Sequence, residues 1–202
     1  MTAIPTILKA INTCICEKSW GVDFVVVRAM RSAVISAVVT AAVSTVGDYL
    51  WANVLPHGQP VYWFAHAIVL FLTIGACLGL PSRRPLAGAL GAVAIGCLAT
   101  AGFWILRPIA GYAGSMFLLF TLLWIALGVL TGRVLQQRDN VGAVLVRSAL
   151  AAVGSGLAFY AISGIWMPFN PHGWAYARHF VSWTIAYLPA FAALLARPPR
   201  NW

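Results

Sequence analysis

The sequence contains few charged residues, and acidic ones are the scarcest. Charged residues make up 8% of the 202 positions, with four acidic residues against thirteen basic ones. A soluble domain carries about 25% charged residues, because its surface has to face water. So few charges cannot cover a water-exposed surface. This excludes an ordinary soluble fold and indicates lipid as the surrounding solvent.

Pairs of carboxylates, which acid–base catalysis often uses, are missing from the apolar part of the chain. Membrane enzymes and ion-coupled transporters usually place ionisable groups inside the bilayer. Of the four acidic residues only Asp48 falls near such a depth, at the outer end of the first apolar run. We therefore expect no catalytic carboxylate pair and no enzyme activity.

Patterns that bind metals or phosphates are missing as well. No two histidines stand three or four residues apart, and the chain has no phosphate-binding loop and no nucleophile elbow. The cysteines have no further ligands at zinc-site spacing; they are Cys14, Cys16, Cys77 and Cys97. We expect no metal, no cofactor and no structural disulfide.

Long apolar runs are what the sequence has in abundance, with hydrophobic residues at 61%. A helix needs about 20 apolar residues to cross the hydrocarbon core of roughly 30 Å. Six runs, separated by segments rich in proline, glycine and arginine, meet this need. They cover about residues 24–49, 61–80, 86–106, 113–130, 141–166 and 174–195. The sequence therefore predicts an all-α, polytopic membrane protein with six transmembrane helices.

The basic residues are distributed unevenly between the ends of these runs. If the N-terminus is cytoplasmic, only Arg107 and Arg178 of the thirteen basic residues fall outside. Positive residues favour the cytoplasmic side, so we expect both termini there and no nucleic-acid partner. The expected organisation is an N-terminal cytoplasmic or interfacial segment (1–22), a six-helix domain (23–196) and a cytoplasmic tail (197–202). The first segment has apolar residues at helical spacing, which indicates an interfacial helix or a frayed terminus.

Small residues recur at four-residue spacing inside the runs. Gly75 and Gly79, Gly128 and Gly132, and Ala152 and Gly156 form three such pairs. These pairs are typical of closely packed helices in membranes. We expect a tightly packed bundle that self-associates through one such face, giving a homo-oligomer.

The most polar cluster of the apolar part, residues 170–179, lies where the sixth run enters the membrane from outside. Arg178 falls about one turn into the membrane, where a charge costs about 2.5–3.5 kcal/mol on the insertion scale. A partner would offset that cost. We therefore expect either an ion pair between Arg178 and Asp48 or an Arg178 side chain that extends to lipid headgroups.

The candidate ligand-binding residues are polar and aromatic side chains near the outer ends of the runs, together with Trp124. Trp124 lies deep in the fourth run, in the bundle core or in the wall of an apolar cavity. An apolar pocket with a few polar groups at its rim suits a lipid with a small headgroup. The candidates are Asp48, Tyr49, His66, Ser115, Trp124, Trp166, Tyr176 and Arg178.

Three short patterns precede and open the last run: Gly164-Ile-Trp166, Pro171 and Tyr176-Ala-Arg178. They are similar to a Gly-x-Tyr turn, a proline and a Tyr-Val-Arg run in the Insig family, and suggest a bacterial homologue. That family comprises sterol sensors with six transmembrane helices and cytoplasmic ends. The resemblance implies this fold with a central lipid pocket, and Ser115 stands where the family has a glutamine. The loop over residues 132–140 lacks the family's acidic partner-binding signature, so its protein partner is not implied.

These observations predict a regulatory lipid-binding membrane protein whose ligand is sterol-like or diacylglycerol-like. The preference for arginine over lysine is typical of a GC-rich bacterial genome, so the expected location is a bacterial plasma membrane. One alternative is a small transporter or channel, which would need a path lined by polar groups. Another is a lipid-modifying enzyme using His66, His172 or His179, which two of these histidines converging on Asp48 would favour.

Overall fold

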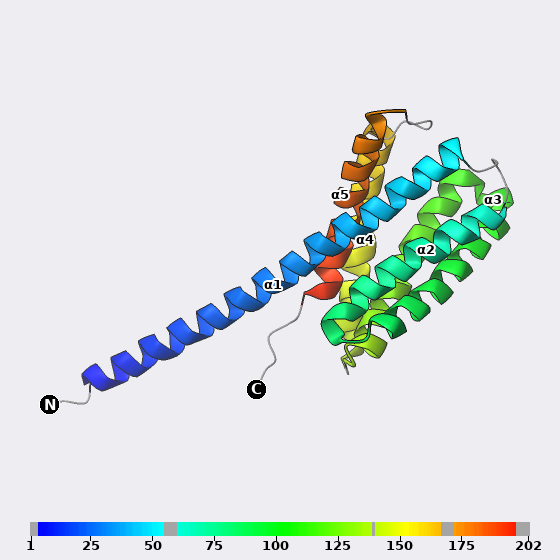
Figure 1. Ribbon diagram of the computed structural model, residues 1–202. Helices are drawn as coiled ribbons and strands as arrows, with labels where there is room; N and C mark the ends of the chain where they lie inside the picture. Colours follow the sequence, from blue (N-terminus) through cyan, green and yellow to red (C-terminus); the bar gives the residue numbers. More distant parts are fainter. Residues whose placement is uncertain (1–3, 55–59, 139, 167–171, 197–202) are drawn as a thin grey trace.

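The chain folds into helices throughout the part that the structure describes. The computed structural model describes residues 4–54, 60–138, 140–166 and 172–196, with side chains from residue 26 onward except those of 60, 63, 112, 113, 116 and 163–166. The elements are α1 (Ile4–Asn53), α2 (Pro60–Gly79), η1 (Leu80–Ser82), α3 (Pro85–Val129), η2 (Leu130–Leu135), α4 (Val141–Trp166) and α5 (Ala175–Leu195) (Figure 1). The all-α prediction is confirmed. The expected tail over 197–202 lies outside the described residues.

Several of these helices are long and apolar enough to cross a membrane. Among the described residues five segments qualify, namely Val26–Asn53, Phe64–Ser82, Pro85–Gly111, Phe117–Leu135 and Val141–Ile162. α5 has 21 residues, which is sufficient length, but its first turns carry Tyr176, Arg178 and His179. The protein is therefore a membrane-type helical bundle with five clear spans and α5 as a sixth candidate.

The third and fourth expected spans lie in one helical element, α3, which reverses direction at Gly111. The φ angle of Gly111 is +70°, a left-handed value that glycine adopts without steric strain. On either side of the reversal the two halves pack together, because Leu119 lies against Gly102 and Leu130 lies against Gly91. This glycine lies between the expected runs 86–106 and 113–130, where the sequence predicts a break. The helix nevertheless continues through Arg107 and Pro108, which were expected to end the third run, and the chain turns at Gly111.

The first helix is longer than the expected first span. α1 has 50 residues and runs without interruption from Ile4 to Asn53. Its N-terminal part extends beyond the other helices, and its C-terminal part crosses them (Figure 1). The segment over residues 1–22 is thus helical from Ile4 onward and continuous with the first span.

Glycines bring neighbouring helices into close contact, as the sequence predicted for two of the three small-residue pairs. A Cβ atom added to Gly75 would lie 2.1 Å from the carbonyl oxygen of Gly88. One added to Gly128 would lie 2.1 Å from Ser148 Oγ, while one added to Gly156 would meet nothing within 4 Å. The first two pairs therefore serve packing within the chain, between α2 and α3 and between α3 and α4.

Trp124 belongs to the core of the bundle. Its side chain is completely buried and meets three aromatic rings edge-to-face, those of Phe120, Tyr187 and Phe191, with centroids 6.2–6.3 Å away. Such pairs contribute about 0.5–1.5 kcal/mol each beyond the area they bury. The cluster ties the second half of α3 to α5, the helix that also carries the polar residues described below.

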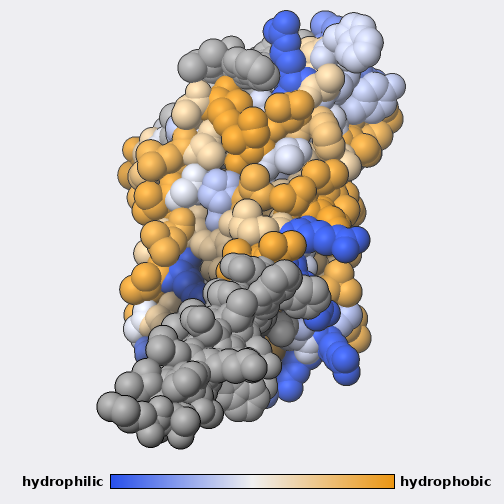
Figure 2. Space-filling model, turned by 90° about the vertical axis from the view of Figure 1, so that its left-hand side faces the viewer, coloured by the Kyte–Doolittle hydropathy of each residue, from blue (hydrophilic) through white to orange (hydrophobic). Residues whose placement is uncertain are grey.

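The outer surface of the helices is strongly apolar. Large hydrophobic side chains such as Ile109 (82% exposed), Leu98 (74%) and Leu157 (68%) point away from the bundle. Figure 2 shows one face on which hydrophobic residues dominate the middle, with hydrophilic residues near the upper edge and in the lower part. In water such a surface would be unfavourable, whereas lipid chains solvate it.

Candidate functional site

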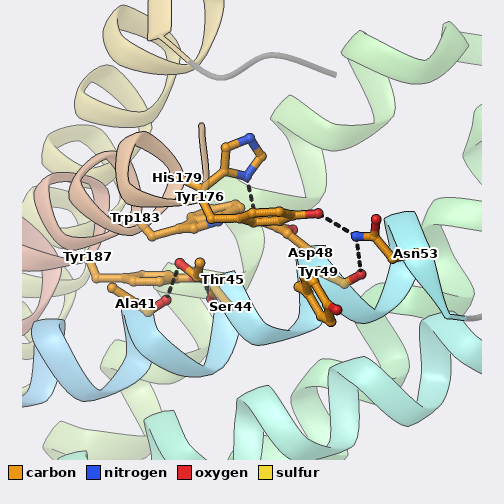
Figure 3. Close-up of polar contacts among 10 residues, drawn as sticks. All are labelled: Ala41, Ser44, Thr45, Asp48, Tyr49, Asn53, Tyr176, His179, Trp183 and Tyr187. Carbon is orange, nitrogen blue, oxygen red and sulfur yellow. Dashed lines mark hydrogen bonds and ion pairs between the residues drawn. The ribbon is translucent and has the colours of Figure 1, made fainter. Parts of the chain in front are cut away.

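Polar side chains of α1 and α5 pair along the contact between these two helices (Figure 3). The paired residues are Ser44, Asp48 and Asn53 on α1, with Tyr176, His179, Trp183 and Tyr187 on α5. Positions rise along α1 as they fall along α5, so the helices run antiparallel. We call these seven residues the α1–α5 ladder.

Asp48 lies in the middle of the ladder and takes two hydrogen bonds on one oxygen. His179 Nδ1 lies 2.8 Å and Trp183 Nε1 2.7 Å from Asp48 Oδ2. No described residue donates to Asp48 Oδ1, and 25% of the Asp48 side chain is exposed. A carboxylate is unfavourable in lipid unless it is paired. The two donors offset that cost on one oxygen and leave the other available to a ligand.

On either side of Asp48 along α1, the ladder has hydrogen bonds between uncharged side chains. The buried hydroxyl groups of Ser44 and Tyr187 lie 2.8 Å apart, and Asn53 Nδ2 donates to the Tyr176 hydroxyl at 2.5 Å. Tyr49 packs edge-to-face against Tyr176, with ring centroids 5.4 Å apart. Asp48 therefore lies between a buried end and an exposed aromatic rim.

Aromatic rings continue from the ladder into the core. Trp183 stacks on Tyr187 with centroids 5.5 Å apart, and on its other neighbour, Phe159 of α4, with centroids 5.3 Å apart. Tyr187 in turn meets Trp124. The indole that donates to Asp48 is thus fixed by stacking, which holds its N–H in place.

His66 of α2 also lies beside this site. A Cβ atom at Gly47 would be 2.0 Å from His66 Cε1, so the imidazole occupies the space that a larger residue at position 47 would fill. The ring is also close enough to interact electrostatically with Asp48. His179 therefore bonds to the Asp48 carboxylate, and His66 lies against Gly47, the residue next to Asp48. Within the described residues, no group of three metal-ligating side chains forms a metal site.

The expected ion pair between Asp48 and Arg178 is wrong. The Arg178 side chain is exposed, and the carboxylate is paired with the next residue, His179. Successive helical positions differ by about 100° around the axis. α5 faces α1 with positions 176, 179, 183 and 187, which leaves position 178 outside the contact. The other expectation, an Arg178 that reaches lipid headgroups, agrees with its exposure.

Three further candidates, Ser115, Trp124 and Trp166, belong to α3 and α4 rather than to the contact between α1 and α5. Ser115 is completely buried in α3, and its hydroxyl has no hydrogen-bond partner among the described residues. Trp124 belongs to the core, and no described side chain or main-chain group pairs with its Nε1. Trp166 is the last residue of α4, and its side chain lies outside the described residues. The structure thus gathers Asp48, Tyr49, His66 and Tyr176 at one place, while Trp124 reaches the ladder only through Tyr187.

Four ladder members, Ser44, Asn53, Trp183 and Tyr187, were not predicted as site residues, and the sequence holds a signal for all of them except Asn53. Their signal was helical spacing: positions 44 and 48 are four apart, as are positions 179, 183 and 187. Residues at this spacing share one helix face. Polar residues on one face of each of two apolar helices indicate that the two faces meet, a pairing that single-residue inspection does not reveal.

No match to this chain is found among protein-family models, curated proteins or solved structures. Any functional proposal therefore depends on the residues of the ladder and on their surroundings. The feature with chemical content is the partly exposed Asp48 carboxylate, which bonds to His179 and Trp183 and has His66 nearby.

Proposed function

We propose that this protein is a six-span, Insig-like membrane protein that binds a lipid whose polar group meets Asp48. The role is regulatory rather than catalytic, and the ligand is sterol-like or diacylglycerol-like. The observation that carries the proposal is Asp48 Oδ1, an acceptor without a described donor on the surface of an apolar bundle. A hydroxyl group on an otherwise apolar molecule would supply that donor.

The surroundings of Asp48 suit such a ligand. Tyr49 is 49% exposed and forms an aromatic rim with Tyr176. Aromatic residues favour the depth where lipid headgroups meet hydrocarbon. A lipid with a small headgroup could place its hydroxyl at Asp48 and its chains among the apolar side chains of α1 and its neighbours.

The six-span topology, with both ends in the cytoplasm of a bacterial cell, has support of two kinds. α5 has 21 residues, enough for one crossing, and its antiparallel packing on α1 returns the chain across the membrane. Arg84 donates to the carbonyl oxygen of Val134 and Arg138 to that of Ala196, so both lie at the end of the bundle opposite Asp48. That clustering is what the positive-inside rule favours for a cytoplasmic end.

Topology is tested by single-cysteine labelling in a variant lacking the native cysteines. Cysteine at exposed Arg83 and cysteine at exposed Arg178 should react with an impermeant thiol reagent from opposite sides of the membrane. Labels at the two chain ends should react from the same side as position 83. Chain ends that react from opposite sides would overturn the six-span proposal.

Lipid binding is tested by native mass spectrometry of the protein after it is purified in mild detergent and transferred to nanodiscs. Wild-type protein should retain diacylglycerol or a sterol-like lipid added in nanodiscs, and Asp48→Asn should retain about tenfold less, the change that 1.4 kcal/mol produces. Arg178→Gln is the matched control, because Arg178 is the exposed neighbour of the ladder. Equal retention by wild type and Asp48→Asn would argue against this site.

A second candidate function is a lipid-modifying enzyme, which the convergence of His66 and His179 on Asp48 favours. An imidazole held by a carboxylate is a common arrangement for proton transfer. Incubation of the protein with labelled lipids in nanodiscs would reveal turnover. Under this reading His66→Gln and His179→Gln abolish product formation while the bound lipid is still retained.

A further inference from the structure

The imidazole of His66 packs against α1 at Gly47, the residue that precedes Asp48. A Cβ atom added to Gly47 would lie 2.0 Å from His66 Cε1 and 2.2 Å from Nδ1, far closer than two such atoms can approach. Glycine is the residue that leaves this space free, because it has no side chain. The fold therefore places an imidazole from α2 beside a carboxylate from α1, an arrangement that neither helix could make alone.

This imidazole forms no hydrogen bond with a described residue. Its interaction with Asp48 is electrostatic, without a hydrogen bond between the two side chains. The hydrogen bonds of Asp48 join Oδ2 to His179 and Trp183 instead. A neutral imidazole has one N–H donor and one acceptor nitrogen. Two groups therefore remain available to a ligand at this site, Asp48 Oδ1 and the imidazole of His66.

Both groups reach the outer surface of the bundle, where the neighbouring side chains are apolar. The side chain of Asp48 is 25% exposed, and His66 is also partly exposed. Ile68 and Val69, which follow His66 within one turn of α2, are exposed to the lipid chains. Hydrocarbon offers no hydrogen bonds to a polar group. A ligand with a lone hydroxyl would pair with Asp48 and leave the imidazole unpaired, which is unfavourable.

We propose that His66 determines which lipid the Asp48 site accepts, by forming a hydrogen bond with a second oxygen atom of the ligand. The preferred ligand then has two neighbouring oxygen atoms in its polar group, at least one of them a hydroxyl, on an otherwise apolar molecule. Asp48 Oδ1 accepts from that hydroxyl, and the imidazole pairs with the other oxygen. A site built to form a hydrogen bond discriminates against an analogue that lacks it. This inference rests on the lipid binding proposed above and names the polar group that such binding selects.

The test compares two lipids with the same hydrocarbon chain and different polar groups. Oleyl alcohol has a lone hydroxyl, whereas 1-oleoylglycerol has two neighbouring hydroxyls. Both are added in equal amounts to the protein in phosphatidylcholine nanodiscs, and native mass spectrometry measures the ratio of the two bound lipids. Wild type should retain about tenfold more 1-oleoylglycerol than oleyl alcohol, the ratio that 1.4 kcal/mol produces. His66→Phe keeps a flat ring without nitrogen atoms and should bring the ratio close to one.

Three further variants separate the imidazole from other causes. His172→Phe is the matched control, because it makes the same substitution at an exposed position before α5 and should keep the wild-type ratio. Gly47→Ala removes no polar group but takes the space of the imidazole, so it should lower the ratio as His66→Phe does. His66→Gln should give an intermediate ratio, since an amide both donates and accepts. Thermal unfolding identifies the folded variants, and Gly47→Ala and His66→Gln decide the test if His66→Phe does not fold.

Failure of this inference differs from failure of the lipid binding itself. If wild type retains the two lipids equally and Asp48→Asn loses both, the lipid site stands and the role of His66 is refuted. A preference that survives in His66→Phe refutes this role too, as does one that His172→Phe abolishes. Retention of neither lipid by wild type, or equal retention by wild type and Asp48→Asn, would overturn the lipid site and this inference with it.

Discussion

Trp183 Nε1 donates a hydrogen bond of 2.7 Å to Asp48 Oδ2, the oxygen that His179 also meets. Trp183→Phe keeps a ring that can stack on Tyr187 and Phe159 but removes this donor. Hydrogen bonds to charged groups contribute about 1.5–3 kcal/mol, so we expect a loss of stability of that order. Thermal unfolding in detergent measures it. Trp174→Phe is the control, because Trp174 is 90% exposed, and an equal loss there would refute the role of the indole N–H.

Asp48 and His179 should be energetically coupled, whereas Asp48 and Arg178 should not. A double-mutant cycle of Asp48→Asn with His179→Gln should give a coupling energy of about 0.5–3 kcal/mol, the range for residues in contact. The cycle with Arg178→Gln should be additive within about 0.5 kcal/mol. Denaturant unfolding of the six proteins supplies both numbers. Coupling to Arg178 as strong as to His179 would contradict the observed pairing.

The buried hydrogen bond between Ser44 and Tyr187 should show an asymmetry between single and double substitution. Tyr187→Phe leaves the Ser44 hydroxyl buried without its partner, which costs about 1–3 kcal/mol. Ser44→Ala with Tyr187→Phe removes both polar groups, so most of the lost stability should return. Melting temperatures of the single and double variants measure the difference. A double variant less stable than Tyr187→Phe would show that this hydrogen bond is not what limits stability.

Much of this fold follows from the sequence, and the site follows only in part. The apolar runs and the proline- and glycine-rich breaks predict the helices, because length and hydropathy are local properties. The reversal at Gly111 falls within the expected break between the third and fourth runs, but the helix continues past Pro108, because helices in membranes tolerate proline. Asp48 was identified because a lone carboxylate near the membrane is rare. Its partner was misassigned to Arg178, because the rotation of α5 about its axis depends on packing that no local pattern records.

Close helix packing should make Gly75 intolerant of any side chain. A Cβ atom there would lie 2.1 Å from the main-chain oxygen of Gly88, and backbone cannot move aside as a flexible side chain can. Overpacking of this kind costs about 1–3 kcal/mol, so Gly75→Ala should lower the melting temperature clearly. Gly156→Ala is the matched control, because it adds the same methyl group to α4 where nothing lies within 4 Å. There the better helix propensity of alanine, about 1 kcal/mol, should leave stability unchanged or raised. Equal melting temperatures for the two variants would show that α2 and α3 are less closely packed at Gly75 than the 2.1 Å distance indicates. The four-residue glycine spacing would then not predict close packing in this chain.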